Sequence, residues 1–234
     1  MSAPTPLSVL PNAQRADRVR RLRRLDVCAV SDALDKLQLT GLESHVPQQS
    51  GEHRIAGAIV TLKVGVGTPL PGAPRHLGTA AIEQASPDHV IVIEQRSGVD
   101  AGCWGGLLTL GARVRGVAGV VADGPVRDID EARGYQFAIF TRSLTARTAR
   151  GRVVELGTNV PITPWAHPVK PEDFVIADRS GVAFIPAQKI DEVLQAAEAI
   201  VAREAEMAKA LLAGAEPATV MAGNYENMLK AEPS

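Results

Sequence analysis

The sequence predicts one mixed α/β domain that contains parallel strands. Three observations support this fold class. The length of 234 residues suits one large domain. Short apolar runs rich in β-branched residues alternate with runs of helical periodicity. Hydrophobic residues make up 45% of the chain and aromatic residues 3%, so Val, Ile, Leu and Ala must build the core.

The first half of the chain alternates helical and extended patterns. Residues 55–64 read IAGAIVTLKV, and their β-branched side chains predict a strand. Residues 89–94 read HVIVIE and predict a short buried strand. Ser31 and Asp32 suit the early turn of a helix. The helices expected here cover residues 13–25, 30–37 and 76–85, with a loop rich in Gly and Pro at 65–74.

A strand–helix–strand unit follows. Gly105 and Gly106 open a helical stretch that Gly116 ends, and the apolar run VAGVVA at 117–122 is the next strand. This spacing predicts that 117–122 pairs in parallel with 89–94. The remaining expected elements are a short helix between Arg127 and Gly134, β segments at 137–140, 153–156, 160–162, 174–177 and 182–185, and an amphipathic helix at 188–212.

Composition divides the chain into three parts. Three prolines among the first eleven residues predict a flexible N-terminal arm over residues 1–12. Residues 13–214 form the expected α/β domain. Residues 215–234 are expected to form a C-terminal helical tail.

Charge and cysteine content exclude several classes of protein. The formal net charge of −1 argues against binding of nucleic acid. Cys28 and Cys103 are too few for a disulfide framework or a zinc site, and they suit a reducing cytoplasm. No segment is apolar enough for a signal peptide or a membrane span, so a cytoplasmic protein with no membrane contact is expected. A basic cluster is interpreted as a solvated helix face; its members are Arg18, Arg20, Arg21, Arg23 and Arg24.

Common catalytic motifs are absent from the sequence. Gly65 and Gly67 follow a strand but lack the third glycine and the helix of a dinucleotide site. The five histidines form no pair at metal-binding spacing, and no Gly-x-Ser-x-Gly elbow is present. His167, in a loop, has two open interpretations: a ligand contact or an ordinary loop residue.

Residues 119–130, GVVADGPVRDID, form the most informative stretch. A buried strand leads to a turn, and Arg127 and Asp128 stand directly beyond it. The ends of parallel strands are where α/β folds bind ligands. The Arg127 guanidinium can hold a carboxylate, and the Asp128 oxygens can hold Mg²⁺ or Mn²⁺. The alternative is a surface ion pair at the start of a helix.

The same stretch resembles the signature of the RraA-like family, which includes class II 4-hydroxy-4-methyl-2-oxoglutarate aldolases. The resemblance covers most of the chain. It implies a swivelling β/β/α domain with helical arms, assembled as homotrimers or homohexamers. The other resembling segments are residues 31–35, 56–61, 85–90, 104–108, 169–173 and 178–182, with Pro186.

The resemblance also implies roles for particular residues. Asp128 would carry the divalent metal, and Arg127 would bind the carboxylate of a pyruvyl group. A glutamate on the C-terminal helix of a neighbouring subunit would approach the metal-bound waters; Glu204 is the nearest match and Glu206 the second, with a solvated helix face as the alternative. Backbone N–H groups at the glycine-led helix would complete the carboxylate site, and they belong to the stretch Gly105, Gly106, Leu107 and Leu108.

The chain departs from the family pattern at one critical position. The aldolases carry an aspartate twenty-one positions before the signature arginine, where this chain has Gly106. Asp100, in the preceding loop, is one candidate substitute. We therefore expect weak cleavage of 4-hydroxy-4-methyl-2-oxoglutarate and better decarboxylation of oxaloacetate. The usual glycines near residues 164–168 are also replaced, by Trp165, Ala166 and His167.

The combined prediction is a Mg²⁺- or Mn²⁺-dependent carbon–carbon lyase that acts on a small 2-oxo acid through a pyruvate enolate. The alternative is a non-catalytic binding module, because the family includes proteins that restrain a ribonuclease. A methyltransferase, another activity assigned within the family, is disfavoured because the sequence shows no cofactor-binding signature.

Overall fold

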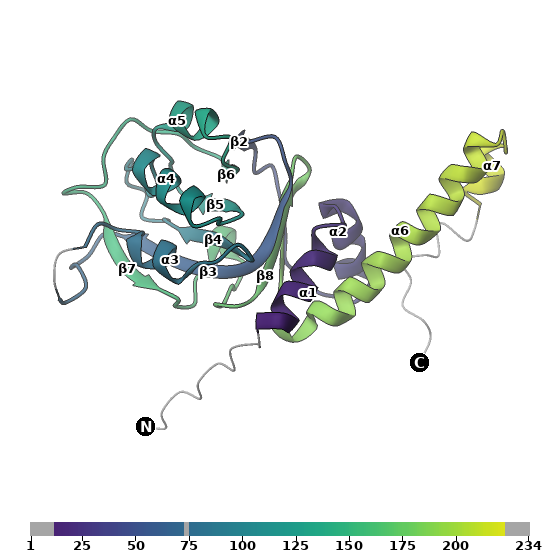
Figure 1. Ribbon diagram of the computed structural model, residues 1–234, viewed down its shortest axis with the longest axis horizontal. Coiled ribbons are helices and arrows are strands. Elements are labelled where there is room, and N and C mark those ends of the chain that lie inside the picture. The colour runs from purple at the N-terminus through teal and green to yellow at the C-terminus, as the bar shows by residue number, and fades with distance from the viewer. Residues whose placement is uncertain (1–11, 73–74, 223–234) are drawn as a thin grey trace, which may run out of the picture.

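The longest strand, β3 (Ile55–Gly65), lies at the centre of a nine-stranded mixed sheet. The structure is a computed structural model that describes residues 12–72 and 75–222 (Figure 1). On one side, β3 pairs in parallel with β4 (His89–Glu94). On the other side, its first half pairs with β8 (Phe174–Asp178) and its second half with β7 (Val154–Thr158), both antiparallel.

The parallel part of the sheet confirms the predicted strand–helix–strand unit. β4 pairs in parallel with β5 (Gly119–Asp123), and β5 pairs in parallel with β6 (Ile139–Thr141). The crossover helices are α4 (Gly106–Val114) and α5 (Ile129–Gly134). Every residue of β4 is buried, which explains why its four central residues, 90–93, are all apolar rather than alternating with polar ones.

The antiparallel strands complete the order β1-β9-β8-β3-β4-β5-β6-β2. β9 (Gly181–Ile185) pairs with β8 and with β1 (Leu42–Ser44), and β2 (Gln48–Ser50) closes the other edge. Neither β1 nor β2 was predicted from the sequence. Their sequences, LES and QQS, lack the apolar pattern of a strand because they lie at the edges of the sheet.

Two groups of helices cover different parts of the sheet. α1 (Asn12–Leu22), α2 (Val27–Lys36) and α6 (Ile190–Leu212) share a core with β8, β9 and the first half of β3. α4 and α3 (Thr79–Gln84) cover the second half of β3 with β4 and β5. Figure 1 shows these two groups as separate parts of the molecule.

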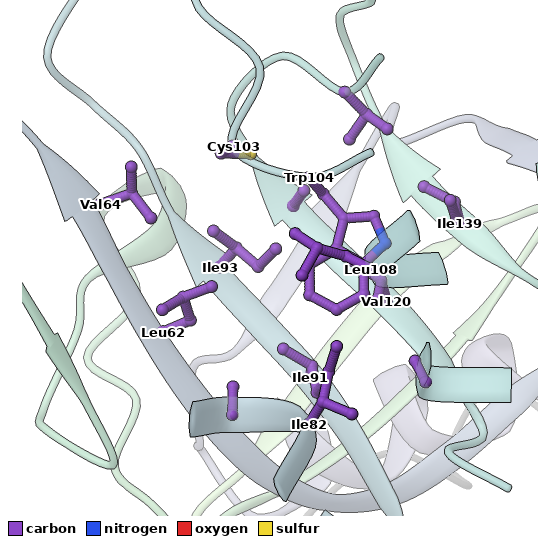
Figure 2. Close-up of a cluster of buried hydrophobic side chains, with 14 of the residues drawn as sticks. Leu62, Val64, Ile82, Ile91, Ile93, Cys103, Trp104, Leu108, Val120 and Ile139 are labelled. Atoms are coloured by element: carbon purple, nitrogen blue, oxygen red, sulfur yellow. The ribbon is translucent and has the colours of Figure 1, made fainter. Parts of the chain in front are cut away.

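Trp104 lies at the centre of the core under α4. Its side chain is almost fully buried, and Figure 2 shows it among Ile91, Ile93, Leu108 and Val120. Its indole N–H donates to the Thr109 hydroxyl at 3.0 Å. This hydrogen bond gives a partner to the one polar group of the side chain, which burial would otherwise leave without one. The aromatic ring thereby anchors the residues that lead into α4.

Several predicted boundaries were wrong. α2 begins at Val27 because the Asp26 carboxylate accepts a hydrogen bond from the Ala29 N–H at 2.8 Å, so Ser31 and Asp32 lie in its second turn. The predicted strand at 160–162 contributes only an isolated bridge between Ile162 and Val169. The helix predicted at 76–85 is limited to α3, and the helix predicted from residue 188 becomes regular at Ile190.

The basic cluster on α1 and directly after it forms only part of the solvated face that its pattern predicted: Arg20, Arg23 and Arg24 are exposed, whereas Arg18 and Arg21 are partly buried. Arg18 makes two hydrogen bonds to Asp191, and Arg21 makes two to Glu198 at 2.8 and 2.7 Å. Arg23 donates to backbone carbonyls of residues 56 and 87. The cluster therefore attaches α1 to α6 and to the sheet.

The proposed division of the chain lies partly outside the described residues. The N-terminal arm is outside them up to residue 11, and Asn12 already begins α1. Within the tail, the structure describes a short helix, α7 (Pro217–Val220), and nothing beyond residue 222. None of the helices in residues 12–72 and 75–222 combines the length and apolarity needed to cross a lipid bilayer.

Glu172 joins three elements through a partly buried network. Its carboxylate accepts from Arg15 on α1 at 3.2 Å and contacts His89 Nε2, at the start of β4, at 3.3 Å. The Ser86 N–H donates to His89 Nδ1, so Nε2 carries the proton and donates to Glu172. This hydrogen bond, with the charge of Arg15, holds the pKa of Glu172 below its usual value despite burial.

Replacing Glu172 by glutamine should therefore destabilise the fold in a pH-dependent way. Because the folded pKa is lowered, the stabilisation exists above the unfolded value of about 4.3 and is lost as the pH falls through the folded pKa. We expect Glu172→Gln to lower the free energy of unfolding by about 1.5–3 kcal/mol at neutral pH. Below about pH 4, the difference in the free energy of unfolding between the variant and the wild type should become smaller. Urea unfolding checks this, with exposed Glu206→Gln as the control; an equal cost at both pH values would contradict it.

Candidate active site

The loops that follow β4 and β5 lie side by side at the same edge of the sheet. The Cys103 N–H donates to the Pro125 carbonyl at 2.8 Å, and the Arg127 N–H donates to the Trp104 carbonyl at 3.0 Å. Trp104 and Val126 thus form a parallel bridge beyond the strands. These bonds bring the start of α4 against the Arg127–Asp128 pair, although more than twenty residues separate them in sequence.

Asp128 turns the chain from this loop into α5. Its φ of +57° and ψ of 38° are left-handed, a conformation that aspartate tolerates better than most residues. Its Oδ2 accepts a hydrogen bond from the Gly106 N–H at 3.0 Å, and its Oδ1 accepts one from Arg127 Nε at 3.2 Å. Both side chains remain about one third exposed, at 35% for Arg127 and 32% for Asp128. The pair is anchored yet accessible to a ligand.

Glycines provide the space that this pair occupies. A Cβ on Gly102 would lie 3.0 Å from Arg127 Cγ, and a Cβ on Gly105 would lie 3.1 Å from the same atom. The Gly105 Cβ would also lie 2.9 Å from Asp128 Oδ2. Any larger residue at either position would push the arginine or the aspartate from its place.

The first turn of α4 offers unpaired backbone donors beside the pair. Among the described residues, the N–H groups of Leu107 and Leu108 have no hydrogen-bond acceptor. The first turn contains no acidic residue, and the Asp128 carboxylate takes up only the Gly106 N–H, so these two donors at the positive end of the helix dipole remain available to an anion. Together with the Arg127 guanidinium, these donors suit a small carboxylate.

A cavity of about 920 Å³ opens onto these groups, within the upper range for small-molecule sites. Three arginines line it. Arg127 pairs with Asp128 and Arg75 with Glu83, whereas Arg150 has no carboxylate partner in the described part of the chain. The Glu155 carboxylate, also in the wall, accepts from the Gly78 N–H and the Thr158 hydroxyl. The charge of the cavity therefore favours an anionic ligand.

The oxygen donors at Asp128 suit a hard divalent cation. Among residues 12–72 and 75–222, no group of three or more His, Cys, Asp or Glu side chains is placed to hold a metal. A protein site with one or two carboxylates fits Mg²⁺, which retains several waters and takes further oxygens from a substrate. Such a site does not fit zinc, which is bound by three or four protein ligands, mainly His nitrogen and Cys sulfur atoms.

Some predicted site residues lie elsewhere. Glu204 and Glu206 are exposed on α6, which packs against α1 and α2 rather than near α4, and Glu206 pairs with Lys209. Asp100 pairs with Arg147 at 3.0 Å outside the cavity wall. Among the predicted site residues, all of which the structure describes, those brought together within one chain are residues 105–108 at the start of α4 and the Arg127–Asp128 pair.

The loop with Trp165, Ala166 and His167 also lies outside the wall of this cavity. His167 Nε2 contacts a Glu43 carboxylate oxygen at 3.2 Å, so the structure gives it a protein partner. Trp165 and Ala166 have φ values of +46° and +73°, which explains why glycine would suit these positions. The Trp165 N–H donates to Asp123 Oδ2 at 2.6 Å, which holds the strained loop in place.

Cys103, although next to the site, is not a nucleophile. Its side chain is fully buried, and burial raises the pKa of the thiol to about 12. It therefore stays protonated at neutral pH and acts as a small apolar residue in the core.

One residue beside the site, Glu131 on α5, was not predicted from the sequence. Its carboxylate Oε2 lies 2.0 Å from the position that a Cβ on Gly106 would take. No pattern in the sequence indicates this contact, because residues 106 and 131 belong to different helices and meet only after folding.

Comparisons with known proteins agree with this architecture. The family model described as RraA-like, Aldolase/RraA, matches residues 27–184, more than half of the chain. The chain belongs to the RraA-like family. A relative from Halalkalibacterium halodurans, named "Putative 4-hydroxy-4-methyl-2-oxoglutarate aldolase", is 32% identical over 183 residues, which cover 78% of this chain and 82% of that protein.

Solved structures of other proteins share the fold. An uncharacterized protein from Pseudomonas syringae aligns with a TM-score of 0.79 and 26% identity, covering 94% of this chain and 98% of that one. Streptomyces coelicolor RraAS2, described as an unusual member of the RNase ES inhibitor RraA protein family, aligns with a TM-score of 0.69 and 23% identity. That alignment covers 86% of this chain and 97% of RraAS2 and shows the fold alone.

Replacing Gly105 by alanine should damage ligand binding more than folding. The new Cβ would displace Arg127 and Asp128, whereas the φ of −160° at Gly105 suits alanine. We expect affinity for a small carboxylate such as pyruvate to fall about ten- to a hundredfold, the equivalent of one charged hydrogen bond. The free energy of unfolding should change by about 1 kcal/mol or less. Calorimetric titration and urea unfolding measure the two effects.

Gly134→Ala is the matched control for this substitution, because a Cβ there meets nothing within 4 Å. It should bind pyruvate like the wild type. Wild-type affinity in Gly105→Ala would show that Arg127 does not bind the carboxylate.

Proposed function

We propose that this protein is a Mg²⁺- or Mn²⁺-dependent carbon–carbon lyase that acts on a 2-oxo acid through a pyruvate enolate. The observation that carries the proposal is the Arg127–Asp128 pair, held against the open N-terminus of α4 in a cavity with excess positive charge. The names of the curated relatives support the same reaction class. The proposed substrates are a 4-hydroxy-2-oxo acid and oxaloacetate.

The chain's own residues provide the binding and the charge stabilisation. The Arg127 guanidinium and the N–H groups of Leu107 and Leu108 would hold the carboxylate of the 2-oxo acid. Asp128 would hold the divalent ion, which supplies Lewis-acid stabilisation of oxyanion charge when bound. Both proposed substrates leave the same pyruvate enolate, so these fixed donors would stabilise the charge that develops in either reaction.

The proposed assembly is a homotrimer or homohexamer. Glu204 is exposed on α6, away from the site of its own chain, so it can approach a site only in a second copy. An apolar stripe along α4 is also exposed: Leu107 at 85%, Leu110 at 38% and Val114 at 79%. Helix spacing puts these side chains on one face, as expected of a surface that another copy covers.

A non-catalytic binding module is the second candidate. Its support is the likeness to RraAS2, whose description names an RNase ES inhibitor family. This function would use a surface and would need neither the Arg127–Asp128 pair nor a metal. The two candidates therefore differ in the outcome of one enzymatic assay.

Pyruvate release from oxaloacetate tests the proposal. The purified full chain should release pyruvate with Mg²⁺, lose the activity in excess chelator and regain it with Mg²⁺ or Mn²⁺. Asp128→Asn should stay folded, since asparagine tolerates the left-handed backbone, while Mg²⁺ affinity collapses with turnover. Calorimetric Mg²⁺ titration compares it with Asp100→Asn, whose aspartate pairs with Arg147. A folded protein without metal-dependent activity would favour the binding module.

Arg127→Lys should separate substrate binding from metal binding. Lysine keeps the positive charge but loses the two-pronged geometry of the guanidinium. We expect kcat/KM for oxaloacetate to fall about ten- to a hundredfold. Mg²⁺ affinity, measured by calorimetry, should stay close to that of the wild type. A loss of Mg²⁺ affinity together with kcat/KM would mean that Arg127 mainly holds Asp128 in place.

A further inference from the structure

We propose that Glu131 supplies the carboxylate that accepts the C4-hydroxyl proton when a 4-hydroxy-2-oxo acid is cleaved. This inference rests on the proposed lyase function and assigns the protein a residue for one of its two reactions. It replaces the expectation of weak aldol cleavage, which followed from the missing side chain at Gly106.

The geometry at Gly106 leads to this assignment. A Cβ built on Gly106 would lie 2.0 Å from Glu131 Oε2, 2.7 Å from Glu131 Cδ and 3.3 Å from Asp128 Cβ. The Glu131 carboxylate thus occupies the volume into which any side chain at position 106 would extend. The absence of a side chain at residue 106 is what lets a carboxylate from α5 reach the start of α4.

The structure of α5 explains how Glu131 reaches this place. Asp128 precedes the helix, and the Glu131 N–H donates to the Asp128 carbonyl at 3.1 Å in its first turn. The two carboxylates therefore project from one helical turn toward Gly106. Near the helix N-terminus, a negative side chain is also favoured by the helix dipole.

The Glu131 carboxylate is not committed to another partner. Among the described residues, it makes no hydrogen bond or ion pair. By contrast, its neighbour Asp130 pairs with Arg133 at 3.0 Å and has a side chain 91% exposed. Glu131 also lines a hollow of about 560 Å³ that shares Arg127 and Asp128 with the main cavity. A substrate held by Arg127 has room to extend toward Glu131.

The chemistry requires a proton acceptor at that end of the substrate. In retro-aldol cleavage, the C4 hydroxyl gives its proton to the Glu131 carboxylate and the C3–C4 bond breaks. The C–C electron pair forms the pyruvate enolate, and C4 becomes the carbonyl of the second product. Return of the proton to C3 yields pyruvate and restores the carboxylate, so no oxidant, reductant or further reactant is consumed.

Decarboxylation of oxaloacetate lacks this demand. There the bond to the C4 carboxylate breaks, carbon dioxide leaves, and its electron pair forms the same enolate without removal of a hydroxyl proton. Glu131 should therefore be required for aldol cleavage and dispensable for formation of the enolate from oxaloacetate. A purely structural role could not separate the two reactions.

The first experiment measures both reactions in Glu131→Gln. The wild type should cleave 4-hydroxy-4-methyl-2-oxoglutarate as well as decarboxylate oxaloacetate. In the variant, kcat for aldol cleavage should fall about 10²–10⁴-fold, the usual contribution of a positioned acid–base group. Formation of carbon dioxide from oxaloacetate should continue at the wild-type rate. Asp130→Asn is the matched control and should keep both activities.

A second experiment moves the carboxylate back to position 106. Glu131→Ala should lose aldol cleavage, and adding Gly106→Asp to it should restore at least part of that activity, because the new side chain grows into the vacated volume. Gly106→Asp alone should bring no gain, since Glu131 already fills that space. Urea unfolding of each variant establishes that the protein is folded.

The outcomes separate this inference from the proposed function. A wild type that decarboxylates oxaloacetate but does not cleave the aldol substrate would overturn the role of Glu131 and leave the lyase intact. Retention of aldol cleavage in Glu131→Gln, or equal loss of both reactions in that variant, would likewise overturn the role of Glu131 and leave the lyase intact. A folded wild type with neither activity would overturn both proposals.

Discussion

The parallel register of β4 and β5 is the constraint on which the candidate site depends. Glu94 lies opposite Asp123 at the ends of the two strands, and the Gln95 N–H continues the pairing to the Asp123 carbonyl at 2.7 Å. Both loops therefore leave the sheet at the same level. They then form a second set of backbone hydrogen bonds, between residues 103–104 and 125–127, which brings α4 to Asp128. An antiparallel pair would direct the two loops to opposite edges.

Space within the site is controlled by residues that lack side chains. Gly102 and Gly105 leave room for the Arg127 side chain, and Gly106 leaves room for the carboxylate of Glu131. A protein can thus keep a chemical group at one point in space while changing the residue that provides it. Although residue 106 carries no carboxylate, the carboxylates of Asp128 and Glu131 both lie beside it.

Ion pairs and an apolar core together attach the N-terminal helix to the rest of the domain. Arg18 and Arg21 bind α6, while Arg15 joins Glu172 and His89 at the start of β4. These ion pairs are partly shielded from solvent. Arg21 makes two hydrogen bonds to Glu198, a geometry that contributes more to stability than an isolated surface ion pair does. α1, α2 and α6 consequently share one apolar core with β8 and β9.

The strand–helix–strand unit, the Arg127–Asp128 turn and the family could all be predicted from the amino-acid sequence. Buried strands and turns can be predicted from the local sequence, because burial on both faces demands continuous apolar residues and glycine marks the turns. Three features emerge only in the folded chain: the edge strands β1 and β2, the partners of Arg18 and Arg21, and the position of Glu131. Each of these depends on contacts between residues distant in sequence, and such contacts impose no periodicity on either segment. Residues 106 and 131 meet only because the sheet first sets α4 and α5 side by side.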